Sequence, residues 1–187
     1  MTLSAGTRAR FLGAVELFDS RVAAVPSDAW SSPSPCEGWT ARDVVAHVVT
    51  NLRALRAAVA GGDFFAVFGQ AVEGNIVSAW SEQRSGASPL VERAETVELM
   101  NVGGNPVSPE MMLDALMRDL VVHTWDVARA VGGDERLPAD LVAAATAAMA
   151  SVGPELRGPG LYGAEVAAPP GASALASLLA LSGRNPD

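Results

Sequence analysis

PCEGWTARDVVAHVV, the stretch from residue 35 to residue 49, decides the fold because it combines a helix start with a histidine set among valines. Thr40 and Asp43 have the spacing of a capping box, in which each side chain bonds the other residue's backbone N–H group at a helix N-terminus. The helix predicted from this start runs to about Ala60, where two glycines follow. We expect His47 to face the protein interior, because its neighbours are apolar.

The rest of the chain is also predicted to be mainly helical. Apolar residues recur every three or four positions, and helix-start and helix-stop residues bound the segments. These signals predict further helices over residues 6–25, 64–83, 108–131, 138–152 and 172–182. The segment 85–89 is predicted to break the chain after the third helix, and a short hairpin or an irregular loop is predicted between residues 93 and 109.

Four main helices with a long connection before the fourth predict an all-α four-helix bundle. The two predicted helices nearest the C-terminus are additional to this bundle, so we expect them to pack on its outside. A chain of 187 residues is of ordinary size for one domain, and we predict that residues 1–187 form a single one.

Composition excludes several classes of function. The net charge of −8 and the isoelectric point of about 4.7 argue against nucleic acid as a partner, because phosphate contacts need clustered positive charge. No apolar run reaches the roughly 20 residues of a membrane span, and the first residues lack the apolar segment of a secretory signal. We therefore expect a soluble cytoplasmic protein without a membrane partner. All 13 basic residues are arginine, which excludes chemistry that needs a lysine.

The chain has only two histidines, His47 and His123, and both lie among valines. Asp119 precedes His123 by four residues, so the two share a helical face. His47 lies ~10 Å from the start of its helix and His123 ~12 Å from the end of its own, so antiparallel helices would bring them level. An inward-facing carboxylate needs a partner, and a metal ion, a protonated histidine or an arginine such as Arg118 or Arg53 would serve.

Two histidines and one carboxylate would leave coordination positions open, as catalytic zinc sites do, and the same set suits Fe(II) or nickel. Asp126 follows His123 by three residues and is predicted to orient it or to anchor the helix, although it could be a rival ligand. Asn51 lies four residues after His47 on the same helical face. Other side chains that could line a pocket, with core packing as the alternative, are Arg118, Trp125, Trp39, Trp80 and Met112.

The single cysteine, Cys36, rules out an internal disulfide and a C-x-x-C site. A thiol near a helix start can be reactive, but no histidine or second cysteine is near it in the sequence, so we expect a buried spectator. The chain has no G-x-S-x-G motif, and no G-x-G-x-x-G motif follows a predicted strand. Neither a serine hydrolase nor a dinucleotide-binding fold is therefore predicted.

Three segments of the chain resemble a known family. PCEGWTARDVVAHVV is similar to the C-x-G-W-T-x-R-D-x-x-x-H segment of the DinB-like superfamily, in its mycothiol-dependent maleylpyruvate isomerase N-terminal domain group. DLVVHTWDVARAVG (119–132) resembles the second signature of that group, and LASLLALSGRNPD (175–187) resembles its usual ending. The resemblance implies a four-helix bundle of up-down-down-up topology, in which the second and fourth helices are antiparallel.

The resemblance also implies a metal triad of His47, Asp119 and His123. Family enzymes use a divalent ion to activate the thiol of a small cosubstrate such as mycothiol or bacillithiol. The implied function is therefore a metal-dependent thiol transferase or isomerase acting on a small electrophile, with zinc as the first choice of metal and nickel or iron as alternatives. Characterised members more often have glutamate or histidine at the position of Asp119, which leaves the metal's identity open.

The full isomerase has a further C-terminal domain, so we do not expect maleylpyruvate isomerisation itself. Two alternatives to an enzyme are a metal- or ligand-binding helical bundle without turnover and a metal-free structural homodimer.

Overall fold

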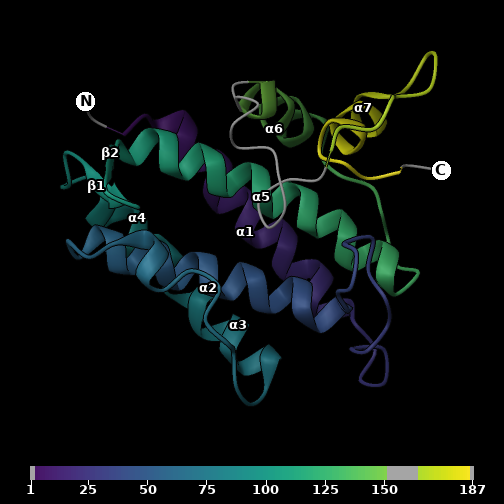
Figure 1. Ribbon diagram of the computed structural model, residues 1–187, viewed down its shortest axis with the longest axis horizontal. Helices are drawn as coiled ribbons and strands as arrows, with labels where there is room; N and C mark the ends of the chain where they lie inside the picture. Colours follow the sequence, from purple (N-terminus) through teal and green to yellow (C-terminus); the bar gives the residue numbers. More distant parts are fainter. Residues whose placement is uncertain (1–2, 151–163, 186–187) are drawn as a thin grey trace.

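The computed structural model describes residues 3–150 and 164–185, and these are mostly helical (Figure 1). Three long helices, α1 (Ala5–Ala24), α2 (Ala41–Val59) and α5 (Pro109–Ala130), form the body of the protein, and α5 packs against both of the others. Within the described residues the fold is therefore all-α apart from one small hairpin, as the sequence predicted. No helix within the described residues is both long and apolar enough to cross a membrane.

The directions of the long helices follow from contacts near their ends. The backbone N–H of Ser4, which caps α1, donates to Glu110 in the first turn of α5, so α1 and α5 begin at the same end. Cys36 precedes α2 and yet contacts Asp126 near the end of α5, so α2 runs the opposite way. The sequence permitted this antiparallel arrangement of α2 and α5, and the structure has it (Figure 1).

Side-chain caps explain where the main helices begin. The capping box predicted at Thr40 and Asp43 is complete, because each side chain bonds the other residue's backbone N–H group. The hydrogen bonds from Thr40 also hold the pKa of Asp43 below its ordinary value. This start places His47 on the second turn of α2. Helix α5 begins as predicted at Ser108, whose hydroxyl oxygen accepts from the N–H of Met111.

The third helix predicted over residues 64–83 is wrong in its first half. Phe64–Ala66 forms only a single 3-10 turn, η1, and a regular helix, α3 (Ile76–Ser85), begins ten residues after that turn. Gly69 and Gly74 lie between them with φ angles of 76° and 77°. This left-handed conformation suits glycine and cannot continue a right-handed helix, so the apolar periodicity of the segment does not produce one.

The break predicted over residues 85–89 is smaller than expected. A single residue, Gly86, separates α3 from α4 (Ala87–Ala94). Pro89 lies in the first turn of α4, where a missing N–H costs no helical hydrogen bond. The chain therefore resumes a helix where the sequence suggested a loop.

The hairpin alternative for residues 93–109 is correct. Strands β1 (Met100–Val102) and β2 (Asn105–Val107) pair antiparallel, with Met100 opposite Val107. Gly103 and Gly104 connect them with φ angles of 61° and 84°, and two positive φ angles in a row are the requirement of a two-residue hairpin turn with the twist of its strands.

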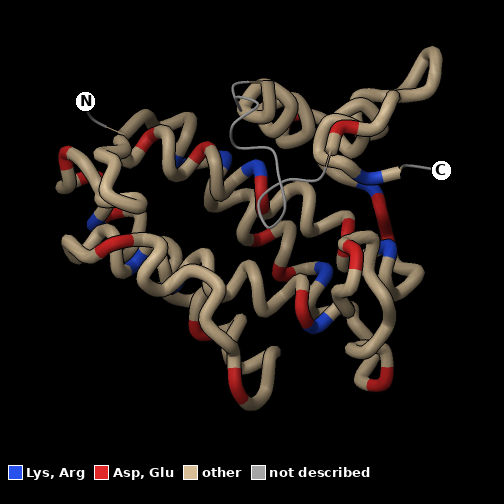
Figure 2. The backbone as a smooth tube through the Cα atoms, viewed as in Figure 1, with Lys and Arg blue, Asp and Glu red and all other residues tan. Residues whose placement is uncertain are grey.

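The two helices predicted nearest the C-terminus both form, and they pack beside the three long helices. Helix α6 (Ala139–Ala150) lies against α5, and α7 (Ala174–Leu181) lies against α6. The last two residues of the helix predicted over 138–152 lie outside the described residues. Figure 2 shows that acidic residues occur at intervals along the described chain.

Candidate metal centre

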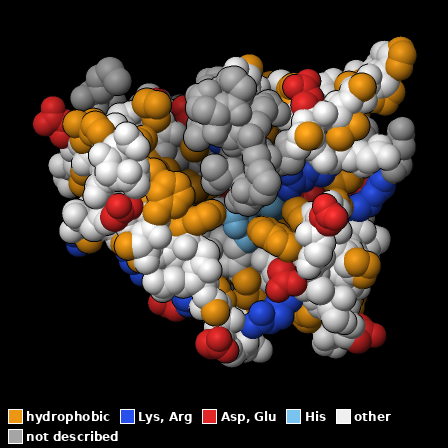
Figure 3. All heavy atoms as spheres, viewed as in Figure 1, with side chains coloured by type: hydrophobic (Ala, Val, Ile, Leu, Met, Phe, Trp, Pro, Cys, Tyr) orange, Lys and Arg blue, Asp and Glu red, His pale blue; other side chains and the backbone are white. Residues whose placement is uncertain are grey.

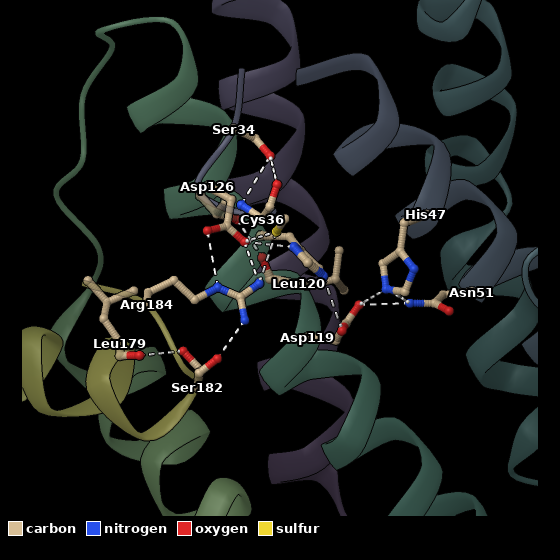
Figure 4. A network of polar contacts seen from close by, with 12 residues as sticks. Ser34, Cys36, His47, Asn51, Asp119, Leu120, Asp126, Leu179, Ser182 and Arg184 are labelled. Atoms are coloured by element: carbon tan, nitrogen blue, oxygen red, sulfur yellow. Dashed lines mark hydrogen bonds and ion pairs between the residues drawn. The ribbon is translucent and has the colours of Figure 1, made fainter. Parts of the chain in front are cut away.

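His47 on α2 meets Asp119 and His123 on α5. Figure 4 shows the side chains of His47 and Asp119 facing each other. The distance from His47 Nε2 to Asp119 Oδ2 is 3.4 Å, and the distance from His123 Nε2 to Asp119 Oδ1 is also 3.4 Å. One potential ligand atom from each residue lies within 4.8 Å of the others. Two imidazole nitrogens and one carboxylate thus point at a common centre, which is an arrangement that can share one cation.

The cluster lies at the edge of the core, with one side open to solvent. The side chain of His123 is 7% exposed, whereas those of His47 and Asp119 are 17% and 16% exposed. Figure 3 shows histidine surface near the centre of the viewed face, between apolar side chains. The cluster therefore keeps a small exposed area on this side.

Electrostatics couple the three groups. Burial would raise the pKa of Asp119, but the charges of His123 and His47 hold that pKa well below its ordinary value. Burial would lower the pKa of His123, but Asp119 raises it well above its ordinary value. Without a metal, a proton on His123 therefore balances the carboxylate, which is one of the partners that the sequence left open.

The arginines considered as partners of Asp119 extend to other parts of the protein. Arg118 is buried, and its Nη1 donates to the backbone carbonyl of Ala148 at 2.9 Å, toward α6. Arg53 lines a surface hollow formed with α3. A pocket role for Arg118 at the cluster has no support from these contacts.

Asn51 contacts two of the three residues of the cluster. Its Nδ2 lies 2.7 Å from Asp119 Oδ2 and 3.0 Å from His47 Nε2. The carboxylate only accepts hydrogen bonds, so the amide nitrogen must face it, and a neutral His47 then accepts at Nε2 and carries its proton on Nδ1. The amide oxygen is buried and has no hydrogen-bond partner among the described residues. Because buried acceptors are normally paired, this oxygen is available to a group that enters the cluster.

A second polar network lies directly behind His123. Asp126 is fully buried, and its Oδ2 lies 2.8 Å from His123 Nδ1 and 2.8 Å from Arg184 Nη2. Burial would raise the pKa of Asp126, but His123 and Arg184 hold that pKa below its ordinary value. An ionised Asp126 requires the proton of a neutral His123 on Nδ1, which leaves Nε2 free to face Asp119. Asp126 therefore lies where an orienting residue would be needed.

Sequence reasoning missed two members of this network. Arg184 follows α7 and reaches Asp126 across 58 residues of sequence, and only the family-like ending of the chain pointed to its segment. Cys36 is partly exposed, whereas a buried spectator was expected. Its Sγ lies 3.4 Å from Asp126 Oδ2 and 3.2 Å from Arg184 Nη2, so its polar neighbours come from distant parts of the chain.

Cys36, His123 and Asp126 also have ligand atoms within 4.8 Å of one another. This second group is a poor cation site, because the guanidinium of Arg184 already contacts both the sulfur and the carboxylate. A bound cation would face a buried positive charge at close range. Among the described residues no arginine is in direct contact with Asp119, and Arg184 acts on Asp119 only through a longer-range charge interaction.

Aromatic side chains flank the cluster. The ring of Trp39 lies 5.2 Å from that of His47 and 6.2 Å from that of His123, measured between centroids. Phe68 lies 5.7 Å from the ring of His47, in an edge-on arrangement. Trp39 was among the predicted pocket residues, whereas Phe68 was missed because its segment was assigned to a regular helix.

The other predicted pocket residues belong to the core. Trp80 is buried and donates to Asp19 on α1. Trp125 is 2% exposed and donates to Glu135, so it does not line the cluster. Met112 is also buried in the core, as the alternative of core packing expected.

A helical domain that brings two histidines and a carboxylate together between antiparallel helices is the class of protein that these features define. Residues 11–128 match the family model of the mycothiol maleylpyruvate isomerase N-terminal domain, so the chain belongs to that DinB-like family. The match includes the whole cluster and ends before Arg184.

Curated relatives carry no functional assignment. The chain is 27% identical over 149 residues to the uncharacterized protein Rv0738 of Mycobacterium tuberculosis strain H37Rv, and this covers 79% of the chain and 80% of the relative. The uncharacterized protein MT0763 of strain CDC 1551 matches with the same identity and coverage.

Proposed function

We propose that the protein binds one divalent metal ion on His47, Asp119 and His123 and acts as a thiol-dependent transferase or isomerase on a small electrophile. The observation that carries the proposal is the convergence of two imidazole Nε2 atoms and one carboxylate on a common centre. The family to which the chain belongs is described by a mycothiol-dependent isomerase, which supports a low-molecular-weight thiol as the cosubstrate. We also propose that the fold is the family's up-down-down-up four-helix bundle. In this bundle α3 and α4 together occupy the position of the third helix.

The donor set fits a divalent transition metal. Two neutral imidazoles and a carboxylate suit zinc first and Fe(II) or nickel as alternatives, and three protein ligands leave room for a further one. The buried oxygen of Asn51, which has no hydrogen-bond partner among the described residues, adds an acceptor close to the open coordination position. A divalent ion bound here would lower the pKa of a coordinated thiol or water toward neutrality.

The surrounding residues would bind and orient the reactants. Asn51 donates to Asp119 and so restrains the rotation of the carboxylate. Asp126 holds the proton of His123 on Nδ1. Trp39 and Phe68 offer apolar ring surface beside His47, which suits an electrophile with an unsaturated or apolar part.

The function is tested by following the loss of free thiol. We expect zinc-loaded protein to consume mycothiol, or a simpler thiol at higher concentration, with at least one member of a panel of electrophiles. Asp119→Asn is expected to reduce this rate to the background, because it removes the charge that the cation needs. Asp114→Asn is the matched control, since Asp114 lies on the same helix and pairs with Arg10 at 3.3 Å away from the cluster. Bound zinc without thiol consumption by any electrophile would instead support the alternative of a non-catalytic metal-binding protein.

Zinc affinity is expected to rise with pH. Asp119 raises the pKa of His123 well above its ordinary value in the metal-free protein, so this imidazole keeps a proton to higher pH than a free one, and an ion must displace that proton. With one proton released per ion, each pH unit below that pKa is expected to weaken the apparent affinity about tenfold. Calorimetric titrations at three pH values, in buffers of different ionisation enthalpy, measure both the affinity and the proton release. An affinity that does not change with pH would contradict the assignment of His123 as a ligand.

A further inference from the structure

We propose that Arg184 is a positioning residue, which grips Asp126 and so holds the imidazole of His123 with Nε2 facing Asp119 and His47. The inference rests on the proposed function and adds to it, because it gives the segment after α7 a part in forming the metal site. That segment lies outside the residues that match the family model.

The first step is the grip of Arg184 on Asp126. Nη2 of Arg184 lies 2.8 Å from Oδ2 and Nε lies 3.3 Å from Oδ1, so the guanidinium contacts both carboxylate oxygens (Figure 4). The side chain of Asp126 is fully buried and that of Arg184 is 12% exposed. A two-point contact of this kind fixes the plane of the carboxylate as well as its position.

The second step is the effect on His123. Oδ2 of Asp126 accepts from Nδ1 of His123 at 2.8 Å as well as from Arg184. A carboxylate whose plane is fixed in this way holds the imidazole ring in one orientation and its proton on Nδ1. Partners behind a ligating histidine that fix its ring and tautomer commonly change metal affinity about 10–100-fold when they are removed.

The third step is what fixes Arg184 itself. The N–H of Arg184 bonds the carbonyl of Leu179 at 2.9 Å, and the N–H of Gly183 bonds that of Ala180 at 3.0 Å. With Gly183 at a φ of 81°, this is a Schellman motif, which ends α7 and turns the chain back toward α5. Nη1 of Arg184 also donates to the carbonyl of Ser182 at 2.7 Å, which holds the guanidinium in place.

Arg184 also ties the segment before α2 to the same point. Its Nη2 lies 3.2 Å from Sγ of Cys36, four residues before the Thr40 cap of the helix that contains His47. The guanidinium thus contacts two segments that are remote from it in the sequence, and both lead directly to proposed ligands. A purely structural arginine would not need to bind the same carboxylate oxygen, Oδ2 of Asp126, that accepts from Nδ1 of His123.

The test compares Arg184→Met and Arg184→Lys with the wild type and with Arg129→Met. Arg129 is the matched control, because it lies near the end of α5 and pairs with Glu135 at 3.1 Å. Zinc affinity is measured by competition with a chromophoric chelator. Long-range ¹⁵N–¹H spectra report the tautomer of each imidazole and the protection of its N–H proton. The chain has only two histidines, so the two rings can be assigned with one variant at His47.

We expect Arg184→Met to weaken zinc binding about 10–100-fold and to expose the Nδ1 proton of His123 to exchange, with the signals of His47 unchanged. Arg184→Lys is expected to recover part of the zinc affinity and part of the protection of the His123 Nδ1 proton. An ammonium keeps the charge but contacts the carboxylate of Asp126 at one point only. Arg129→Met is expected to keep the wild-type zinc affinity and the wild-type protection of the His123 Nδ1 proton. If Arg184→Met and Arg184→Lys change only thermal stability, with wild-type zinc affinity and a protected His123 proton, the inference is overturned.

Failure of the proposed function would look different. In that case the wild type itself would not bind zinc. The exchange of the His123 Nδ1 proton in the metal-free protein, at a pH where the ring is neutral, would then still test the positioning role. A proton equally protected in the wild type and in Arg184→Met would overturn that role without reference to the metal.

Discussion

The variant His47→Ala is expected to lose almost all of the stabilisation that zinc gives the folded protein. At a free zinc concentration about 100 times the dissociation constant, the wild type gains ~2.7 kcal/mol, because the ion binds the folded state alone. For a chain of this size the gain corresponds to a rise in Tm of about 5–11 °C. Loss of one of three protein ligands is expected to weaken binding at least ~100-fold, which leaves a gain of only ~0.4 kcal/mol at the same zinc concentration.

His47 is the best residue for this test because it is the more exposed histidine, at 17%, and its removal leaves the Asp126 network intact. Thermal melts with and without zinc, followed by circular dichroism, give the result. Asp114→Asn is expected to keep the full zinc-dependent shift, since Asp114 lies outside the cluster. A wild-type shift in His47→Ala would place the ion elsewhere, with the group of Cys36, His123 and Asp126 as the next candidate.

Asp126→Asn is expected to have the largest effect on stability without metal. The substitution keeps the shape of the side chain but removes the charge that balances the buried guanidinium of Arg184. Breaking one side of a buried ion pair costs about 3–5 kcal/mol, because the remaining charge stays buried without its partner. Urea denaturation in the presence of a chelator measures the loss.

Two control variants help to interpret the stability loss of Asp126→Asn. Asp134→Asn, which breaks an exposed surface pair with Arg136, is expected to change the free energy of unfolding far less than Asp126→Asn does. The double variant Asp126→Asn with Arg184→Met is expected to be more stable than Asp126→Asn alone, because it removes the unbalanced charge. A loss below ~1 kcal/mol in Asp126→Asn would show that Arg184 finds solvent or another partner at little cost.

The contribution of Asp126 should also depend on pH. The pKa of its carboxyl is below the ordinary value of 3.8 in the folded protein, so the folded state holds fewer protons than the unfolded state in this range. The stabilisation is therefore full above that ordinary value and is lost as the pH falls through the folded pKa. The difference in unfolding free energy between wild type and Asp126→Asn is expected to shrink only under acid conditions.

The features that the sequence predicted correctly are those set by local interactions. The starts of α2 and α5 depend on Thr40, Asp43 and Ser108, which act within four residues of themselves. The shared face of Asp119 and His123 follows from helical spacing alone. The meeting of His47 with that pair needed only one further assumption, the antiparallel direction of the two helices.

The features that were missed depend on tertiary contacts or on backbone conformation. Residues 64–83 have the apolar periodicity of a helix, but Gly69 and Gly74 adopt left-handed φ angles that the periodicity does not reveal. Arg184 and Cys36 reach Asp126 from opposite ends of the chain, so no sequence spacing relates them. Their contacts with Asp126 depend on the packing of α7 against α6 and of α6 against α5.

The most direct test of the central claim is anomalous diffraction from crystals of the zinc-loaded protein at the zinc absorption edge. The account predicts one strong peak between α2 and α5, at coordination distance from the Nε2 atoms of His47 and His123 and from the carboxylate of Asp119. A loaded crystal without a peak at this centre, or with its strongest peak beside Cys36 and Asp126, would contradict it.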